Sequence, residues 1–183
     1  EDTVPINRKN EVRRDISGIL SDNNSPTLIR VNNEPGFLKA DLKEMVRKNV
    51  YAILLPKAED PDQIQEIDSI MTETEHERGL EKNSVKLIPM IETALGVVRC
   101  YNLAISSPRI ESVSFGSAED GDLQGDLQCS WSIEGTELIY ARSKVLLDAR
   151  AAKLPYVLDG AYSDIKNGDS LLKDCQLSRR LGY

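Results

Sequence analysis

The sequence contains few of the side chains that build disulfide frameworks or zinc sites. Among 183 residues there are three cysteines and one histidine. Cys100, Cys129 and Cys175 lie far apart and match no Cys-x-x-Cys spacing, which predicts reduced thiols. His76 lies in a polar stretch at 72–78, where a solvated helix surface is its expected environment. Acid–base chemistry must therefore fall to carboxylates, to metal-bound water or to a group outside this sequence.

Two further absences exclude whole classes of partner. No apolar run approaches the roughly 20 residues that span a bilayer, and the first residues contain no apolar signal core, so no membrane association is predicted. The net charge of −7, without a long run of Lys and Arg, argues against a nucleic-acid surface. Hydrophobic residues make up 40% of the chain, so we expect residues 1–183 to form one domain with one core. The expected location is cytoplasmic.

Short apolar runs alternate with longer amphipathic stretches along the chain. The runs, rich in β-branched residues and Leu, predict strands at 27–31, 51–55, 86–91, 112–115 and 156–158. The amphipathic stretches predict helices at 7–20, 37–48, 61–78, 94–106, 137–153 and 168–181. Strands that alternate with helices indicate parallel βαβ units. The sequence therefore predicts an α/β fold.

Five predicted strands leave two architectures open, because a closed (β/α)8 barrel needs eight strands and at least about 200 residues. The sheet is either open and doubly wound or part of a larger TIM-like barrel. Residues 1–4 (Glu-Asp-Thr-Val) have the pattern of a strand's last residues, and 181–183 (Leu-Gly-Tyr) place a helix-ending Gly before a further strand. These ends favour the second architecture, part of a larger barrel.

Acidic residues follow two consecutive predicted strands. Glu92 comes directly after the run at 86–91, and Asp120 follows the run at 112–115. In a β/α barrel the carboxyl ends of neighbouring strands lie side by side, where barrel enzymes build their active sites. Mg²⁺ binds one or two carboxylates and leaves its other positions to water and substrate oxygens. Glu92 and Asp120 are therefore the predicted metal ligands; the alternatives are a helix N-terminal acid for Glu92 and a solvated turn for the acidic loop.

Seven short motifs follow one another along nearly the whole chain. They are Glu-Asp-Thr-Val at 1–4, Ile-Arg-Val-Asn at 29–32, Leu-Pro-Lys-Ala-Glu at 55–59, Pro-Met-Ile-Glu-Thr at 89–93, Phe-Gly-Ser-Ala-Glu-Asp at 115–120, Tyr-Ala-Arg-Ser at 140–143 and Asp-Gly-Ala-Tyr-Ser-Asp at 159–164. Each is weak alone, but together they resemble the citrate lyase β-subunit-like family of the HpcH/HpaI aldolase superfamily. The resemblance implies a TIM-like barrel that is incomplete here, with strand one, most of strand two and strand eight missing from this sequence. It also implies Mg²⁺ or Mn²⁺ as cofactor, and a homotrimer that acts as a carbon–carbon lyase.

The resemblance also implies roles for single residues. The metal would chelate the carboxylate and the adjacent oxygen of a keto acid. Arg30, which interrupts an apolar strand, would donate N–H groups to a substrate carboxylate or a developing oxyanion. Glu1, Asp2, Lys57 and Asp159 would contribute to substrate binding. Arg30 could instead form a buried ion pair with Glu1 or Asp2.

The chain departs from the family pattern at two places. One additional residue, Ser117, precedes Ala-Glu-Asp, which leaves Glu119 as the alternative to Asp120 as second metal ligand. Gly160 and Ala161 replace a more usual Thr-Val-like pair after Asp159. We expect the second departure to change the substrate detail and not the fold.

Three functions remain open at this point. The favoured one is Mg²⁺-dependent cleavage of a citryl, citramalyl or malyl thioester, carried by CoA or an acyl carrier, into an acyl thioester and oxaloacetate, pyruvate or glyoxylate. The second is a class II aldolase that uses a free keto acid and no thioester. The third is a non-catalytic or subunit role in a lyase complex. Lys57 and Glu59 could also serve only as a scaffold ion pair under the active site.

Overall fold

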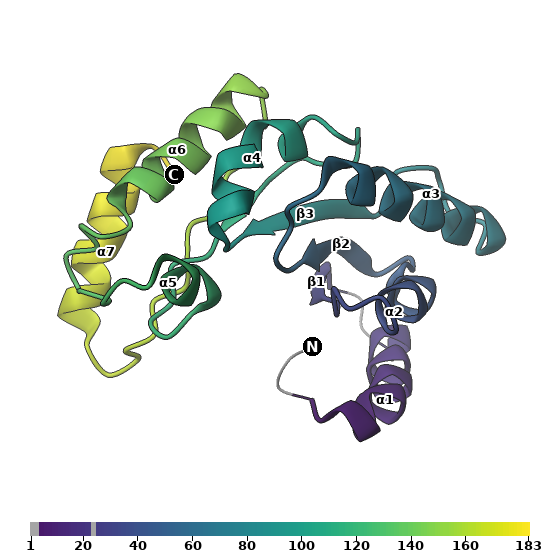
Figure 1. Cartoon of the computed structure of the whole chain (residues 1–183). Coiled ribbons are helices and arrows are strands. Elements are labelled where there is room, and N and C mark those ends of the chain that lie inside the picture. The colour runs from purple at the N-terminus through teal and green to yellow at the C-terminus, as the bar shows by residue number, and fades with distance from the viewer. Residues whose placement is uncertain (1–3, 23–24) are drawn as a thin grey trace.

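A computed structural model of the chain describes residues 4–22 and 25–183. Within these residues it contains a four-stranded sheet, seven α-helices and a short 3₁₀ helix at Ile6–Arg8 (Figure 1). The strands are β1 (Thr27–Arg30), β2 (Val50–Leu55), β3 (Lys86–Ile91) and β4 (Ser114–Phe115). The helices are α1 (Lys9–Asp22), α2 (Leu38–Met45), α3 (Pro61–Glu77), α4 (Ala94–Ala104), α5 (Asp122–Leu127), α6 (Ile139–Ala151) and α7 (Gly168–Leu181). A helix follows every strand, which confirms the predicted α/β class.

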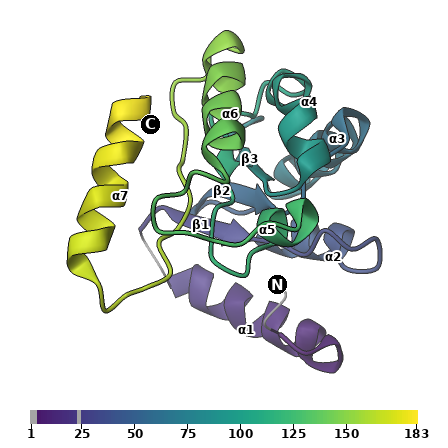
Figure 2. The ribbon, with the colours of Figure 1, turned by 60° about the vertical axis from the view of Figure 1, so that its left-hand side comes forward.

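The sheet has the topology of part of a barrel. All four strands are parallel, and their spatial order, β1-β2-β3-β4, is their order in the chain. An open doubly wound sheet would reverse strand order at a switch point, so that alternative is wrong. The sheet curls as half of a barrel (Figures 1 and 2). A partial TIM-like barrel is confirmed to that extent, while the three strands expected beyond this sequence stay a prediction.

The fifth predicted strand is too short to be one. Residues 156–158 run parallel to β4, where the Leu158 amide donates to the Val113 carbonyl at 2.9 Å and the Phe115 amide donates to the Leu158 carbonyl at 2.9 Å. The two segments form a single parallel bridge between Ser114 and Leu158. Residues 156–158 therefore lie beside β4 and parallel to it, but they form a bridge and not the predicted strand.

The two faces of the sheet differ in what covers them. On the face that packs against helices, Ile53, Leu87 and Phe115 are at most 1% exposed. On the other face, Leu28 is 47% and Leu158 37% exposed, and an apolar hollow of about 310 Å³ lies among such side chains. In a complete barrel, layers of inward-pointing side chains fill this space. The core of the described chain thus lies between sheet and helices.

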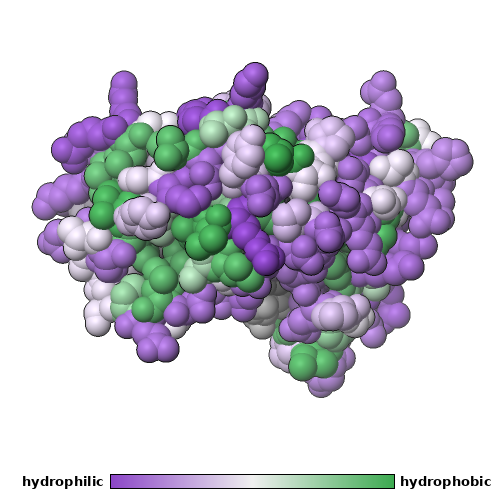
Figure 3. Space-filling model, turned by 45° about the horizontal axis from the view of Figure 1, so that its top comes forward, coloured by the Kyte–Doolittle hydropathy of each residue, from purple (hydrophilic) through white to green (hydrophobic). Residues whose placement is uncertain are grey.

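The outer surface of the helices is mixed in polarity. Figure 3 shows polar residues over most of this face, with apolar residues gathered over one part of it. Exposed apolar side chains of α4 and α6, which pack side by side, include Val98, Tyr101, Tyr140 and Leu147. Within the described ranges, no helix is both long and apolar enough to cross a bilayer.

Side chains cap the starts of α3 and α4, and one further helix was not expected. The Asp60 side chain accepts from the Asp62 amide at 3.1 Å before α3, and the Thr93 side chain accepts from the Gly96 amide at 3.0 Å before α4. Directly after Asp120 and Gly121, where no helix was predicted, the chain forms α5. Six residues with one buried side chain, Leu123, are too few to show a helical period.

A buried arginine joins α3 to the amino-terminal edge of the sheet. Arg109 is 0% exposed, and its guanidinium donates to the Glu75 carboxylate at 2.8 and 2.7 Å, to the Val85 carbonyl at 3.0 Å and to the Asp68 carboxylate. Glu75 is 1% exposed; burial alone would raise the pKa of its carboxyl, but the hydrogen bonds from Arg109 and the amides of Val85 and Asn83 outweigh burial and lower it. This cluster fixes the end of α3 where β3 begins.

We predict that Arg109→Ala lowers the free energy of unfolding by about 3–5 kcal/mol, because the variant leaves the Glu75 carboxylate buried without its counter-charge. Urea unfolding followed by circular dichroism measures the loss. Arg8→Ala is the control, since the Arg8–Glu11 pair is exposed and should contribute nothing measurable. Equal stability of both variants would show that the buried cluster does not hold the fold together.

Candidate active site at the carboxyl edge of the sheet

Glu92 lies in the centre of the carboxyl edge of the sheet, directly after β3. Its side chain is 8% exposed, and one carboxylate oxygen accepts from the Lys57 amide at 2.9 Å. On the other side lies Gly116, directly after β4, where an added Cβ would stand 2.5 Å from the Glu92 Cβ. Real Cβ atoms do not approach so closely. Glycine at 116 is therefore what allows the Glu92 side chain to lie between two strand ends.

The surroundings of Glu92 disfavour its negative charge. Burial raises the pKa of the Glu92 carboxyl, and the nearby negative charge of Asp122 raises it further. The Lys57 amide and the positive charges of Arg30 and Lys57 act in the opposite direction, but the pKa remains above its usual range. A carboxylate in this position gains stability from an added cation.

Lys57 lies in a left-handed turn after β2. Its φ of 49° is unusual for a residue with a side chain, and the turn is held by the Asn33 amide group, which donates to the Pro56 carbonyl at 2.7 Å and to the Lys57 carbonyl at 3.3 Å. This conformation directs the Lys57 N–H to Glu92. The Lys57 ammonium lies 2.9 Å from an Asp122 carboxylate oxygen. The carboxylate that Lys57 meets here thus belongs to α5. The alternative of a Lys57–Glu59 scaffold pair stays a prediction.

The acidic turn 117–122 brings Asp122 toward Glu92. Asp120 is exposed, has φ 55°, and donates its amide to the Gln124 side chain at 2.8 Å. Glu119 is exposed as well. The acid whose charge acts on Glu92 is Asp122, in the first turn of α5. The role of Asp120 as metal ligand stays a prediction, and Asp122 was not singled out because α5 has no clear sequence pattern.

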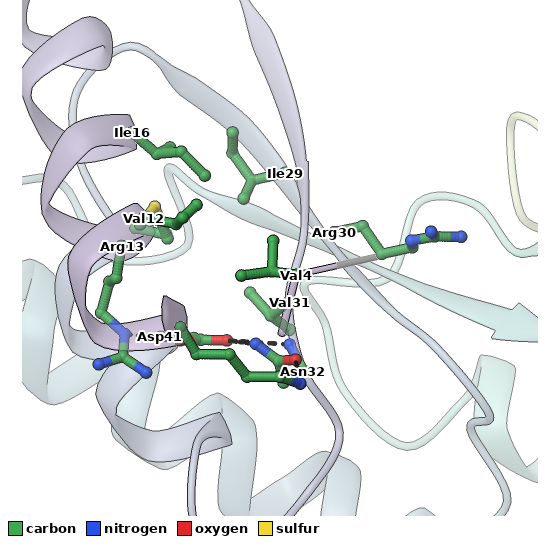
Figure 4. A pocket seen from close by; sticks show the side chains of 11 residues that line it. Val4, Val12, Arg13, Ile16, Ile29, Arg30, Val31, Asn32 and Asp41 are labelled. Carbon is green, nitrogen blue, oxygen red and sulfur yellow. Dashed lines mark hydrogen bonds and ion pairs between the residues drawn. The ribbon is translucent and has the colours of Figure 1, made fainter. Parts of the chain in front are cut away.

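Arg30 ends β1 on the uncovered face of the sheet. Figure 4 shows its side chain pointing away from the apolar group that contains Val4, Ile29 and Val31. Its positive charge lowers the pKa of Glu92, so the structure brings these two predicted residues to one region. Glu1 and Asp2, predicted for substrate binding and as possible ion-pair partners of Arg30, lie outside the described residues.

A buried polar cluster behind β1 supports this strand end. The Asp41 carboxylate of α2 accepts from the Asn32 amide at 2.9 Å, from the Asn32 side chain at 2.6 Å and from Arg13 of α1 at 2.6 Å (Figure 4). Lys9, which is 6% exposed, donates to the Asn32 side chain. The sequence showed Asn32 only as part of a motif. The two cluster residues on α1, Lys9 and Arg13, lie at helical spacing, a pattern equally typical of a solvated helix face.

Asp159 is held by a buried arginine. Arg142 of α6, 5% exposed, donates from Nε to both Asp159 carboxylate oxygens at 3.0 Å and from its terminal nitrogens to Asp159 and Asp174. The Asp159 carboxylate also accepts from the Gly160 amide at 2.9 Å. These bonds fix the segment that follows the β4 neighbour. A substrate contact of Asp159 stays a prediction.

The residues at this edge fit an oxygen-preferring cation. Within residues 4–22 and 25–183, no three His, Cys, Asp or Glu side chains gather as a ready-made metal site. Mg²⁺ does not require one, because one or two carboxylates suffice when water and substrate oxygens complete its shell. Glu92 and the acidic turn supply carboxylates, and Glu92 is desolvated enough to favour a cation. The edge therefore matches Mg²⁺ better than it matches a metal that prefers thiolate or imidazole.

Comparison with known proteins agrees with this geometry. The sequence model of the HpcH/HpaI aldolase/citrate lyase family matches residues 1–183. The chain belongs to this family. It is 32% identical to the citrate lyase β subunit of Haemophilus influenzae over 100% of this chain and 63% of that protein. It is 30% identical to human mitochondrial citramalyl-CoA lyase over 100% of this chain and 56% of that enzyme. The chain thus spans less than two thirds of the length of these relatives.

Solved structures share the fold of this chain. RipC from Yersinia pestis aligns with a TM-score of 0.81 at 19% identity, over 100% of this chain and 77% of that chain. A citrate lyase β subunit from M. tuberculosis, complexed with oxaloacetate and magnesium, aligns with a TM-score of 0.71 at 21% identity, over 100% and 75%. At these identities the likeness concerns the fold, which supports the partial barrel seen here.

We predict that, without divalent metal, Glu92→Gln raises the melting temperature near neutral pH. A carboxyl whose pKa is higher in the folded than in the unfolded protein destabilises the fold when ionised. Wild-type stability should therefore rise as the pH falls through the folded pKa, and the variant should lack that rise. Thermal unfolding in EDTA across pH tests this, with Glu73→Gln on the exposed side of α3 as control. Identical pH profiles for Glu92→Gln and wild type would contradict the electrostatic description of the site.

We predict that Gly116→Ala destabilises this family member by about 1–3 kcal/mol, because the new Cβ overlaps Glu92 and a strand end must move. Chemical denaturation measures the loss. Gly125→Ala is a matched control, since a Cβ at 125 in α5 meets no atom within 4 Å and alanine favours helix. If both substitutions leave stability unchanged, the close approach of residue 116 to Glu92 is refuted.

Proposed function

We propose that this chain carries the metal- and keto-acid-binding part of a Mg²⁺-dependent carbon–carbon lyase acting on a β-hydroxy acyl thioester of the citryl, citramalyl or malyl type. The supporting observation is the carboxyl edge, where a desolvated Glu92 lies among Arg30, Lys57 and an acidic turn. The names of the relatives, citrate lyase β subunit and citramalyl-CoA lyase, point to the same substrate class.

The reaction breaks the bond between the carbinol carbon and the α-carbon of the thioester. The hydroxyl group loses its proton and becomes the keto group of an α-keto acid. The bonding electron pair leaves with the thioester fragment as an enolate, which takes up a proton to give the acyl thioester. A site for this reaction must hold the keto-acid half and stabilise negative charge on oxygen.

The residues of this edge divide those tasks. Mg²⁺, when bound, would supply Lewis-acid polarisation of the keto-acid oxygens. Glu92 and Asp120 would hold the ion, with Glu119 and Asp122 of the same turn as alternatives to Asp120. Arg30 would donate charged N–H groups to the substrate carboxylate, because its side chain extends from the end of β1 away from the apolar group around Val31 (Figure 4).

Lys57 would hold the carboxylates of the site in position and would not take part in the reaction itself. Its amide fixes Glu92 and its ammonium balances Asp122, so both of its polar ends are engaged. Helix α3 begins near the carboxyl edge, and His76 lies in its last turn, at the opposite end of the sheet. His76 therefore cannot take part in chemistry at the carboxyl edge. Within the described residues, proton transfer is therefore left to carboxylates or to metal-bound water.

Arg30→Met should weaken oxaloacetate or pyruvate binding and lower the thioester cleavage rate about 10²–10³-fold, as removal of one charged donor at such a site does. Mg²⁺ affinity should remain, since Arg30 is no ligand. Titration calorimetry with Mg²⁺ and then with keto acid, together with cleavage of citryl-, citramalyl- and malyl-CoA, measures these quantities. Arg8→Met, on the exposed surface, is the matched control.

The same assay separates the alternatives. Aldol cleavage of a free hydroxy-keto acid without CoA would favour the class II aldolase, and metal and keto-acid binding without turnover would favour a subunit role. Absence of any Mg²⁺ binding at millimolar concentration would overturn the proposal. The homotrimer is part of the proposal and is tested by sedimentation velocity.

A further inference from the structure

Ser117 and Gly160 meet where β4 and the neighbouring segment 156–158 end. A Cβ added at 160 would lie 1.7 Å from the Ser117 Oγ, 2.8 Å from its Cβ and 3.0 Å from its amide nitrogen. The φ of Gly160 lies outside the left-handed region, unlike that of Gly79, Gly135 and Gly182. The requirement for glycine at 160 is therefore one of space, because the Ser117 side chain occupies the volume that a side chain at 160 would take.

Neither segment can move away easily. On the Gly160 side, the Asp159 carboxylate accepts from the Gly160 amide at 2.9 Å and is itself bound by Arg142, which is buried in the core. On the Ser117 side, the Gly116 amide donates to the Ile91 carbonyl at 2.9 Å, which holds β4 against β3. A side chain added at 160 would thus push on Ser117 and on the turn that follows it.

That turn carries the acids of the candidate metal site. Residues 118–122 follow Ser117 directly, and the turn closes on itself when the Gly121 amide donates to the Ala118 carbonyl at 3.0 Å. It therefore moves as a unit with Ser117, while Glu92 stays on β3. A displacement of Ser117 changes the position of the acidic turn relative to Glu92.

We propose that Gly160 and Ser117 form a steric lock that positions the acidic turn 117–122 over Glu92, with Gly160 as a positioning residue of the metal site. The Ser117 side chain fills the space that the absence of a side chain at 160 leaves open. The metal-dependent part of this inference rests on the proposed function.

A double-mutant cycle tests the lock with Gly160→Ala, Ser117→Gly and both together. Gly160→Ala should weaken Mn²⁺ or Mg²⁺ binding about tenfold, within the range of coupling between contacting residues. In the double variant the closest remaining atom is the nitrogen of residue 117 at 3.0 Å, which a shift of a few tenths of an ångström relieves, so most of the affinity should return. Gly168→Ala, whose Cβ would meet nothing within 4 Å, is the control.

Trp131 supplies a second readout that needs no metal. It is the only tryptophan of the chain and lines a small hollow together with Ser117, Ala161 and Tyr162. Its fluorescence emission should shift in metal-free Gly160→Ala and return in the double variant. A structural defect elsewhere would not be reversed by removing the Ser117 side chain.

The outcomes separate the lock from the proposed function. Wild-type metal affinity in Gly160→Ala, or equal impairment of the single and double variants, would overturn the lock. If the wild-type protein binds no metal, the proposed function fails, and the Trp131 shift with its reversal still decides whether the lock exists. If Gly160→Ala does not fold, recovery of folding in the double variant supports the lock, and failure of both variants refutes it.

Discussion

The buried pairing of Arg109 with Glu75 and Asp68 is the interaction on which the order of this half-barrel depends. Parallel strands are joined only through long crossovers, so each helix must return the chain to the amino-terminal edge at the correct place. In the crossover from β2 to β3, Arg109 fixes the point where the chain returns to the amino-terminal edge, because it binds the end of α3 and the carbonyl just before β3. Its charge is compensated within the core, so the cost of burying it is offset there. The register of the carboxyl edge follows from this anchor.

The carboxyl edge depends instead on two glycines, positions that lack a side chain. Gly116 lets Glu92 lie between two strand ends, and Gly160 lets Ser117 lie against the next segment. Three consecutive chain segments thus approach one another more closely than side chains would allow. Hydrogen bonds from backbone amides, such as that of Lys57 to Glu92, then define the positions of the functional groups. Backbone-defined positions are more precise than those of long, exposed side chains.

The sequence predicted those features of the fold that depend on apolar periodicity and on where the strands end. The order of strands and helices, the bounds of α7 and the location of Glu92 follow from apolar periodicity and from the rule that strand ends meet at one edge. It did not predict α5 or the approach of Asp122, because a six-residue helix has no readable period. It offered a Lys57–Glu59 pair as one possibility, since neighbouring opposite charges suggest a pair, and did not indicate the contact of Lys57 with Asp122. The left-handed turn that sends the Lys57 ammonium to Asp122 instead depends on contacts from Asn33, far away in the chain.

The positions of the residues in the candidate site are therefore set in two different ways. Glu92, Arg30 and the Lys57 amide belong to strand ends or to a turn bound directly to them, so their mutual positions are set by the sheet. Glu119, Asp120 and Asp122 belong to a turn whose position depends on packing between Ser117 and Gly160. The position of Glu92 at this edge could be predicted from sequence because strand ends obey a general rule. The placement of the three neighbouring acids depends on the local contact between Ser117 and Gly160. The same contact gives the acidic turn a defined distance from Glu92, which a shared cation would require.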